Sequence, residues 1–446
     1  MPILRRIPAV VLLLCLAIPG RADLAAYFAK PEPLYKWEKR GEQTSNGCKV
    51  YDLHLVSQEW QGIKWEHRLQ VFYPEKIEHP EFCTIYNTGG SGSAGNTAMG
   101  IRLAKATGCV YAILLNIPNQ PLYGGLSEDA LIVYTWLKYI ETGDESWPLH
   151  FPMAKAVLKS MYAIQELAKA EKLKPVTGFL INGGSKRGWT TWLAGASRDP
   201  RIKAIAPMVI DILNVIKQGP HQLEAYGKPS EQIGDYTSAG VQEKLETPQG
   251  RRLMELEDPY SYREILTLPK LLILGTNDRY WSQDALNLYW DDLRGPKWVM
   301  YTPNSGHGLE DRDRVYSTLA GFVRMVAGHK KWPKMRWGYK TAKDGTTSLS
   351  VSSSITPLEG RLFHVHASTK DFRDSKWTFN PMALAGNRLS ATYPPPASGY
   401  DAIFGEAVFR IDDMTFTLST QIRILGAGPP ARSSGRTATS GSKPKK

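Results

Sequence analysis

Three residues of this 446-residue chain have the types that hydrolysis by a nucleophilic serine requires. Ser185 follows two glycines, Asp278 follows an apolar run, and His307 lies between Gly306 and Gly308. A serine hydroxyl becomes a useful nucleophile when a histidine accepts its proton, and that histidine needs a carboxylate to orient it. We therefore predict Ser185 as the nucleophile, Asp278 as the acid and His307 as the base.

The sequence around Ser185 is typical of a sharp turn between a strand and a helix. Residues 176–182 form an apolar strand pattern, and residues 186–196 have helical spacing. In a nucleophile elbow, such a turn holds the serine in a strained conformation beside the first amides of the helix. The glycine that usually lies two residues after the serine is replaced by Arg187, and glycine comes one position later, at Gly188. The alternative interpretation is a serine that merely caps the helix.

Asp278 and His307 also have simpler interpretations. Asp278 could cap the helix that follows it, and isolated loop histidines often have no catalytic role. Asp211, which follows an earlier strand, is the reserve acid, and His150 and His221 are alternative bases. The joint occurrence of serine, acid and histidine, in this order and at the ends of predicted strands, favours the first assignment.

Backbone amides near the serine are expected to form an oxyanion hole. We expect one amide from Lys186, which follows the nucleophile, and another from Gly89 or Gly90, which follow a predicted strand. Glycines let the backbone come close to a substrate oxygen. The same glycine run could also be an ordinary turn.

Side chains next to the three residues are expected to contact the substrate. Lys186 and Arg187 could place positive charge against an oxyanion or a substrate carboxylate, or they could form an ion pair at the end of the helix. Tyr280 and Trp281 follow the acid directly and are predicted to line the pocket. Aromatic residues at these positions could equally belong to the core.

Strands and helices alternate over the first three quarters of the chain. Residues 65–74 alternate in polarity as an antiparallel edge strand would. Apolar runs predict buried strands at 82–87, 109–116, 176–182, 204–210, 271–275 and 298–302, and helical spacing predicts helices at 128–139, 153–172 and 186–196. This alternation predicts the α/β class, with an α/β-hydrolase fold whose parallel sheet carries helices on both faces.

Changes of pattern divide the chain into domains. Residues 211–268 are polar and mostly helical between two strands, and we interpret them as a helical cap inserted over the active-site edge. From residue 336, strand patterns alternate with polar or proline-rich turns, at 346–354, 361–367, 407–411 and 415–424. We therefore predict an α/β-hydrolase domain at 23–335 and a small β-sandwich at 336–426.

The two ends of the chain have the composition of segments outside the folded domains. Residues 1–22 contain arginines, an apolar run and small residues near Ala22, which predicts a cleaved signal peptide and a secreted or periplasmic protein. An uncleaved anchor is the alternative. Residues 427–446 are rich in Ser, Gly, Pro, Lys and Arg, and we expect them to be a disordered basic tail.

The net charge of +12 does not indicate a nucleic-acid-binding surface. Three of the arginines lie in residues 1–22 and five unopposed basic residues lie in residues 427–446, which leaves +4 for the remainder. We therefore expect no nucleic-acid partner. The sequence also has no second apolar run long enough to span a membrane, so no integral membrane segment is predicted in the mature chain.

Cysteine content limits crosslinking and metal binding. Loss of residues 1–22 would leave Cys48, Cys83 and Cys109, so at most one disulfide could form within the chain. Cys83 and Cys109 begin buried-strand patterns and are expected to be small apolar fillers. Their spacing does not resemble a metal site, and hydrolysis by a serine needs no cofactor, so neither is predicted.

The segment from Gly183 to Leu193 resembles the PhoPQ-activated pathogenicity-related protein family, a group of secreted α/β-hydrolase-like proteins. Further blocks are similar within about residues 34–425, namely Asn119–Leu122, Glu128–Ala130, Trp147–Pro148, Ala206–Asp211, Gly275–Asp278, Asn304–His307, Asp371–Arg373 and Trp377. The resemblance implies secretion and an α/β-hydrolase fold, with catalytic residues at Ser185, Asp278 and His307. The serine followed by two basic residues is also similar to glucuronoyl esterases, which suggests acidic-sugar esters.

Two functions are compatible with these patterns. The first is a secreted serine hydrolase that cleaves a carboxylic ester or amide through an acyl-serine intermediate, with a small-molecule or carbohydrate ester or a peptide as substrate. The second is a binding or signalling protein that retains the scaffold without turnover, since a fold alone does not determine function. Reaction of Ser185 with an organophosphonate distinguishes the two, because a serine without a working base reacts slowly.

Overall fold

The computed structural model describes residues 24–426, so the predicted signal peptide (1–22) and basic tail (427–446) lie outside the described residues. The N-terminal three quarters contain, in chain order, α1 (Leu24–Ala29), β1 (Lys36–Ser45), β2 (Cys48–Trp60), β3 (Ile63–Pro74), β4 (His79–Asn87), α2 (Ala94–Thr107), β5 (Cys109–Leu114), α3 (Glu128–Thr142), α4 (His150–Ala170), β6 (Gly178–Gly184), α5 (Lys186–Ala196), β7 (Ile202–Met208), α6 (Val215–Tyr226), α7 (Gly234–Ser238), α8 (Val241–Leu245), α9 (Pro248–Glu257), β8 (Lys270–Gly275), β9 (Lys297–Thr302) and α10 (Arg312–Ala327). The C-terminal region contains β10 (Met335–Thr341), β11 (Thr347–Ser353), β12 (Glu359–Ala367), β13 (Thr378–Pro381), β14 (Ala383–Ala385), β15 (Arg388–Tyr393), β16 (Tyr400–Ile411), β17 (Met414–Ser419) and β18 (Arg423–Gly426).

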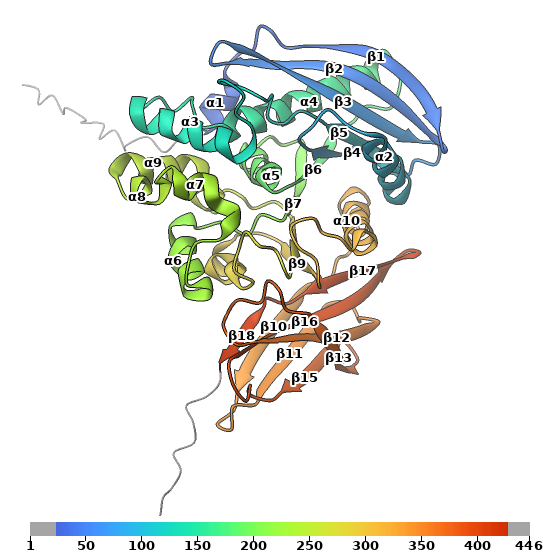
Figure 1. Cartoon of the computed structure of the whole chain (residues 1–446). Coiled ribbons are helices and arrows are strands. Elements are labelled where there is room, and N and C mark those ends of the chain that lie inside the picture. Colours follow the sequence, from blue (N-terminus) through green and yellow to red (C-terminus); the bar gives the residue numbers. More distant parts are fainter. Residues whose placement is uncertain (1–23, 427–446) are drawn as a thin grey trace, which may run out of the picture.

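One mixed sheet runs through the whole molecule (Figure 1). Its strand order is β1-β2-β3-β5-β4-β6-β7-β8-β9, continued by β17, β16, β12 and β13. The strands from β1 to β3 are antiparallel neighbours and β3 is antiparallel to β5, whereas the strands from β5 to β9 in this order are all parallel. Parallel strands connected by helices confirm the predicted α/β class.

Helices cover both faces of the parallel strands. α4 and α5 pack on one face, and α2 and α10 pack on the other. Each face has its own hydrophobic cluster, the first around Phe179 and Trp192 and the second around Phe72 and Phe322. None of the helices between Leu24 and Gly426 is both long enough and apolar enough to cross a lipid bilayer. Because the strands run parallel, their carboxyl ends meet at one edge, and the loops that leave this edge carry the candidate site.

The prediction that residues 65–74 form an edge strand is wrong. β3 lies between β2 and β5, and the sheet extends beyond it through the hairpin of β1 and β2. β1 is the true edge, and its side chains are almost all exposed and largely charged or polar. Such a strand has no apolar alternation that a sequence pattern could reveal, and its charges protect the edge from pairing with other chains.

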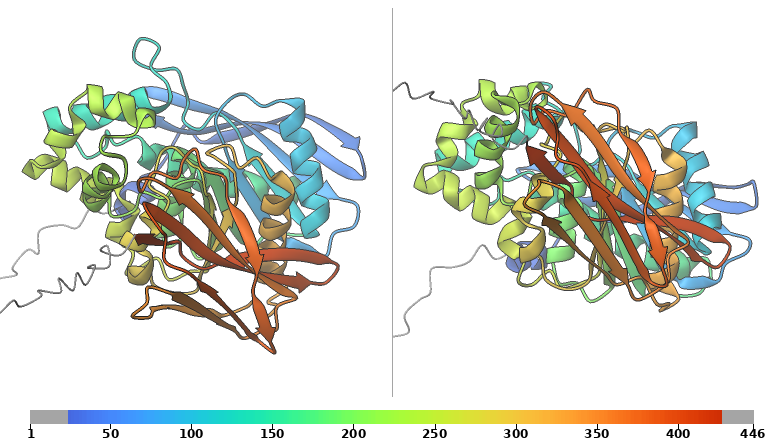
Figure 2. Two further views of the ribbon diagram at one scale, coloured as in Figure 1. Left: turned by 60° about the horizontal axis from the view of Figure 1, so that its bottom comes forward. Right: turned by 90° about the horizontal axis from the view of Figure 1, so that it is seen from below.

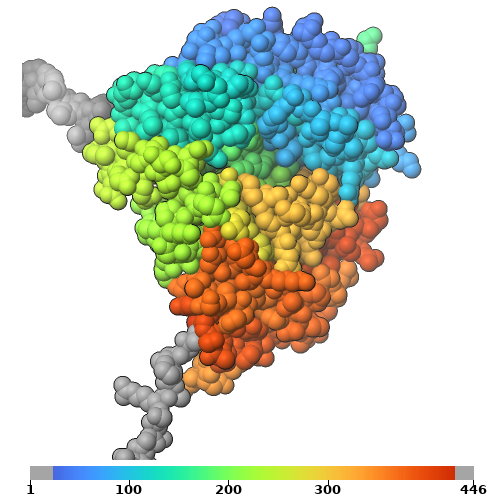
Figure 3. Space-filling view, in the orientation of Figure 1, coloured from blue at the N-terminus to red at the C-terminus, as the bar shows by residue number. Residues whose placement is uncertain are grey.

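A mostly helical segment separates β7 from β8 and contains α6, α7, α8 and α9. It corresponds to the predicted cap at 211–268. Figure 3 shows its surface, in green, in direct contact with the C-terminal region in orange and red. Its action as a cap stays a prediction.

The C-terminal region contains two sheets (Figure 2). β10, β11, β15 and β14 form a separate sheet, while β12, β13, β16, β17 and β18 belong to the large one. The two sheets pack on each other where Leu389 meets Gly360 and Leu349 meets Gly405, positions at which a Cβ would lie 2.6 Å and 2.7 Å from the leucine side chain. The strand predicted at 415–424 is divided into β17 and β18. The proposed domain boundaries themselves stay predictions.

Candidate active site

Ser185 occupies the turn between β6 and α5, at the carboxyl edge of the parallel strands. Its backbone angles are φ 58° and ψ −129°, a conformation that costs a residue other than glycine about 1–3 kcal/mol. Hydrogen bonds hold the turn from both sides, because the Ser185 amide donates to Met208 O at 2.9 Å and the Trp189 amide donates to Ser185 O at 3.0 Å. A strained serine between a strand and a helix is the geometry of a nucleophile elbow.

Two glycines allow α5 to pack this closely on the sheet. A Cβ at Gly183 would lie 2.7 Å from Arg187 O, and a Cβ at Gly188 would lie 2.8 Å from Met208 O. Backbone atoms cannot move aside as a flexible side chain can, so a larger residue at either position would push the helix outward. Position 188 is where α5 comes closest to the β7 backbone. This close contact explains why glycine is found at 188, one position later than in the usual elbow pattern.

Asp278 and His307 lie in the loops after β8 and β9 and form a hydrogen-bonded pair. His307 Nδ1 lies 2.8 Å from Asp278 Oδ2, and the other carboxylate oxygen accepts the Tyr280 amide at 3.0 Å. The Asp278 side chain is buried, whereas that of His307 is 29% exposed. The two loops meet at Gly275, where a Cβ would lie 2.5 Å from Ser305 O. The carboxylate therefore orients the imidazole and leaves Nε2 available to a reacting group.

Tyr280 packs against the His307 ring and also lines the cavity beside Ser185. The Tyr280 ring centroid lies 4.3 Å from that of the imidazole, and the Trp281 ring centroid lies 6.4 Å from it. Both aromatic residues also line the cavity that Ser185 faces. No hydrogen bond within residues 24–426 joins Ser185 Oγ to His307, and serine–histidine bonds are often long in enzymes without substrate.

The residues predicted for the oxyanion hole lie at the start of α5 and in a loop that contacts α5. Lys186 begins α5, so its amide has no acceptor within the helix. Gly89 and Gly90 lie in the loop after β4, which is held in place because the Asn116 amide donates to Gly90 O at 2.8 Å. Gly89 packs on Arg187, since a Cβ at Gly89 would lie 2.8 Å from the guanidinium carbon. The Gly89 loop is thereby attached to the helix that begins next to Ser185.

Lys186 and Arg187 are paired with carboxylates at the start of α3. Arg187 binds Glu128 through two guanidinium nitrogens, at 2.6 Å and 2.7 Å, and donates from Nε to Ile117 O at 2.5 Å. Lys186 Nζ lies 2.8 Å from Glu128 Oε2 and 3.4 Å from Asp129 Oδ1. Partial burial alone would raise the pKa of Glu128, but Arg187 and Lys186 hold it far below its usual range. The ion-pair alternative is thus the observed arrangement, and Glu128 and Asp129 are site residues that the sequence analysis missed.

A cavity of about 120 Å³ lies beside Ser185. It is enclosed by α3, α5, the segment after β7, the cap helices and the loop after Asp278, and Arg187 does not line it. Most lining side chains are apolar or aromatic, among them Ile132, Trp136, Trp189, Val215, Val241 and Leu245. The two charged lining residues, Lys186 and Asp129, pair with each other, and Asp129 also accepts the Tyr236 hydroxyl at 3.1 Å. The cavity is therefore mainly an apolar binding space.

The alternative acid and bases lie in other contacts. The Asp211 carboxylate is buried and accepts the Tyr289 hydroxyl at 2.6 Å, and burial raises the pKa of Asp211 to about 7. His150 is buried against Glu257. His221 Nε2 lies 2.7 Å from an oxygen of Asp284, which holds the pKa of His221 above its usual value. No hydrogen bond connects these three residues to Ser185, Asp278 or His307 among the residues described.

Cysteines and other metal-ligating side chains are dispersed in the part of the chain that the structure describes. Cys48, Cys83 and Cys109 are buried and free, and burial raises the pKa of Cys48 to about 11 and that of Cys109 to about 12. Between residues 24 and 426, no group of three or more His, Cys, Asp or Glu side chains is arranged to hold a metal ion.

Comparison with known proteins identifies sequence and structural relatives. The sequence pattern of the PhoPQ-activated pathogenicity-related protein family matches residues 24–373. The chain is 32% identical over 446 aligned residues to autocrine proliferation repressor protein A of Dictyostelium discoideum, an alignment that covers 90% of this chain and 89% of that protein. Among solved structures, the chain is similar to an acetyl xylan esterase from Paenibacillus sp. R4 (TM-score 0.48, 13% identity, 68% of this chain and 92% of that one). It is also similar to an S-formylglutathione hydrolase from Agrobacterium tumefaciens (TM-score 0.43, 14% identity, 66% and 100%).

Proposed function

The chain belongs to the PhoPQ-activated pathogenicity-related protein family, and from this premise we propose that it is a serine hydrolase that cleaves a carboxylic ester or amide through an acyl-serine intermediate. The observation that carries the proposal is the hydrogen bond of 2.8 Å between His307 Nδ1 and Asp278 Oδ2, in a chain whose Ser185 has the strained backbone of a nucleophile elbow. We further propose that the protein acts after secretion or in the periplasm, as the composition of residues 1–22 predicts.

The proposed reaction follows from the roles that these groups can take. Ser185 Oγ attacks the carbonyl carbon while His307 Nε2 takes the hydroxyl proton, and Asp278 stabilises the imidazolium that results. The Lys186 amide and an amide of Gly89 or Gly90 donate to the oxyanion. The imidazolium then protonates the leaving alcohol or amine, which departs and leaves the acyl group on Ser185. Water, activated by His307, hydrolyses this intermediate and restores the serine.

The cavity supports a substrate with an apolar acyl group. Its lining is mainly aliphatic and aromatic, and burial of apolar surface contributes about 25 cal/mol per Å². An acidic sugar would gain little from Lys186 and Arg187, because Glu128 and Asp129 already neutralise them. We therefore favour a carboxylic ester with a short apolar acyl group over an acidic-sugar ester or a charged peptide.

A second candidate function is binding or signalling without turnover. The observation that favours it is the 32% identity to a relative named as an autocrine proliferation repressor. A signalling protein could retain the strained serine and the histidine–aspartate pair as inherited parts of its scaffold.

Fluorophosphonate labelling of the mature protein, followed by p-nitrophenyl acetate hydrolysis, separates the two candidates. Wild type should label at Ser185, and Ser185→Ala and His307→Ala should both lose turnover. His221→Ala is the matched control, because His221 also pairs with an aspartate but lies outside the proposed set. A wild-type protein that neither labels nor turns over substrate would reject the hydrolase and favour the signalling function.

A further inference from the structure

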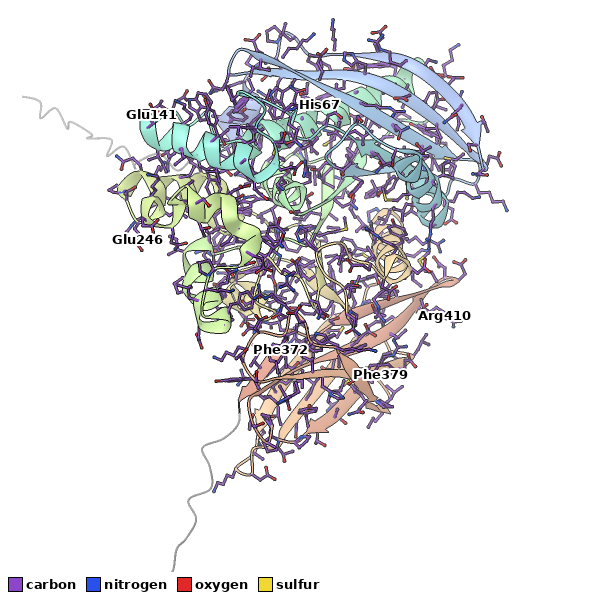
Figure 4. All side chains as sticks on the ribbon, viewed as in Figure 1. His67, Glu141, Glu246, Phe372, Phe379 and Arg410 are labelled. Atoms are coloured by element: carbon purple, nitrogen blue, oxygen red, sulfur yellow. The ribbon has the colours of Figure 1, made fainter. Side chains whose placement is uncertain are left out.

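A short segment of the C-terminal region, Asp371–Trp377, contacts both loops that carry the proposed acid and base. It lies in the connection from β12 to β13, and the proposed hydrolase mechanism gives its residues no role. Phe372, the second residue of the segment, lies where the C-terminal strands meet the α/β region (Figure 4). Phe372, Arg373 and Trp377 are buried, whereas Asp374 and Lys376 are exposed, so one side of the segment packs against the molecule and the other faces solvent.

The segment binds the acid loop through Asn277, the residue directly before Asp278. The Asn277 side-chain amide donates to the backbone oxygens of Ser375 at 2.7 Å, Arg373 at 3.1 Å and Phe372 at 3.4 Å. One side chain therefore contacts three carbonyl oxygens of a single turn, in which the Ser375 amide donates to Phe372 O at 3.0 Å. Backbone carbonyls cannot rotate away as side chains can, so these contacts fix the path of the acid loop.

The segment binds the base loop through Asn304, three residues before His307. The Asn304 side chain donates to Trp377 O at 3.0 Å and accepts the Trp377 amide at 2.7 Å. Asn304 has φ 55°, a left-handed conformation that asparagine tolerates better than most residues. The paired hydrogen bonds set both the position and the orientation of this loop.

The acid and base loops are also joined directly. The Asn304 amide donates to Thr276 Oγ1 at 2.9 Å, and the Asn277 amide donates to Ser305 O at 2.9 Å. The acid loop, the base loop and the segment are thus linked to one another by hydrogen bonds, and each of these links involves Asn277 or Asn304.

The same segment connects the acid loop to the cap. Arg373 pairs with Glu231 at 3.0 Å, and Glu231 also binds Arg279, the residue after Asp278, at 2.6 Å. Arg279 in turn pairs with Asp374 at 2.7 Å. The Arg373 guanidinium lies 3.9 Å from the ring centroid of Tyr226, on α6. Charged contacts through Arg279 therefore hold the acid loop in addition to the hydrogen bonds of Asn277.

We propose that Asp371–Trp377 is a positioning element that fixes the Asp278 and His307 loops relative to each other, with Asn277 and Asn304 as the positioning residues. This inference rests on the proposed hydrolase function, in which the Asp278–His307 bond orients the base. Catalytic groups on loops need a rigid support, and a displacement of about 1 Å can lower a rate about 100-fold. The C-terminal region supplies that support.

Two readouts test the proposal, and one of them does not depend on activity. The first is the downfield proton resonance of the His307 Nδ1–H bond to Asp278, assigned by its loss in His307→Gln. The second is the rate of phosphonylation of Ser185 by a fluorophosphonate. The test variants are Asn277→Ala and Asn304→Gly. Glycine is used at position 304 because it adopts φ 55° without strain. Lys376→Ala is the matched control, because Lys376 lies in the same segment but is exposed.

We expect Asn277→Ala and Asn304→Gly to lose or broaden the resonance and to react about 10- to 100-fold more slowly than wild type, with Lys376→Ala unchanged in both. Folded variants, with wild-type circular dichroism, that keep the resonance and the wild-type labelling rate would overturn the proposal. If either variant does not fold, Asn304→Asp decides. It keeps the acceptor for the Trp377 amide but puts a charged carboxylate oxygen against Trp377 O in place of the donor, so the same loss of the resonance and slower labelling are expected. If wild type itself does not label, the hydrolase function fails, and the resonance alone decides whether the segment positions the pair.

Discussion

His307 and Asp278 come from loops after neighbouring parallel strands, and their side chains meet with His307 Nδ1 2.8 Å from Asp278 Oδ2. We predict that Asp278→Asn lowers kcat by about 10⁴-fold while the fold is retained, because an amide cannot hold the imidazole in the required tautomer. Turnover of p-nitrophenyl acetate and thermal unfolding measure the two effects. Asp284→Asn is the control, since Asp284 pairs with His221 at 2.7 Å. Equal activity of Asp278→Asn and wild type would exclude Asp278 as the acid.

The Asp211→Asn variant tests whether Asp211 is the catalytic acid. We also predict that it is more stable than wild type by an amount that grows with pH. Burial raises the pKa of Asp211 to about 7, so the folded protein binds a proton that the unfolded chain releases between about pH 4 and pH 7. Stability is therefore lost as the pH rises through this window, by at most about 4 kcal/mol. Asparagine cannot ionise, so the Asp211→Asn variant should not lose this stability as the pH rises.

Thermal unfolding of Asp211→Asn and wild type at pH 4 and pH 8 measures this effect. The variant should exceed wild type in melting temperature by more at pH 8 than at pH 4, and it should keep its esterase turnover because Asp278 serves as the acid. The same difference at both pH values would contradict the pKa assignment, and loss of turnover would favour Asp211 as the acid.

Gly188→Ala should destabilise the fold by about 1–3 kcal/mol, because its Cβ would lie 2.8 Å from Met208 O and 2.7 Å from Ile210 Cγ2. Urea denaturation measures the free energy of unfolding. Gly234→Ala is the matched control, since it lies in open space with φ −54° and should be neutral or slightly stabilising. A Gly188→Ala protein as stable as wild type would show that α5 can move away from the sheet at no cost.

Val215→Phe should change the preference for acyl chain length. Val215 lines the cavity, so a larger side chain there takes up the space that a longer acyl group needs. We expect the ratio of p-nitrophenyl octanoate to p-nitrophenyl acetate turnover to fall at least tenfold, that is by about 1.4 kcal/mol. Ile216→Phe changes the next residue of the same helix, whose side chain is 58% exposed, and should leave the ratio as in wild type. An unchanged ratio in Val215→Phe would place the acyl group elsewhere.

The parts that could be predicted from sequence are those whose signal is local. The strands β4 to β9 are buried on both faces, so their sequences are continuous apolar runs. The turn at Ser185 could be predicted because glycines follow one of these runs. Asp278 and His307 could be located because each follows a strand of this kind. The structure brings these two into contact, whereas Ser185 forms no hydrogen bond to His307 within residues 24–426.

The parts that could not be predicted depend on contacts between distant residues or on the backbone. Glu128 neutralises Arg187 from 59 positions away, and a single sequence does not show that the two loops meet. Asn277 and Asn304 bind backbone atoms of Asp371–Trp377. Because every residue type has these backbone atoms, the sequence of the segment does not reveal the contact. The outer strand of the hairpin, β1, gives no apolar signal because it is exposed and polar, whereas β2 is largely buried and its alternating residues carry a strand signal that was overlooked.

The strand that lies beside β9 at the end of the parallel strands, β17, comes from the C-terminal region and is synthesised well after β9. β17 meets β9 at Ser419 and Val299, its Ser419 hydroxyl accepts the Tyr301 amide at 3.0 Å, and its Thr417 amide donates to Thr318 on α10 at 3.2 Å. Until β17 arrives, β9 presents an open edge that could pair with another chain. The sheet that carries the candidate site is therefore completed by a strand of the C-terminal region, and forms shortened before residue 414 should aggregate because β9 keeps an open edge.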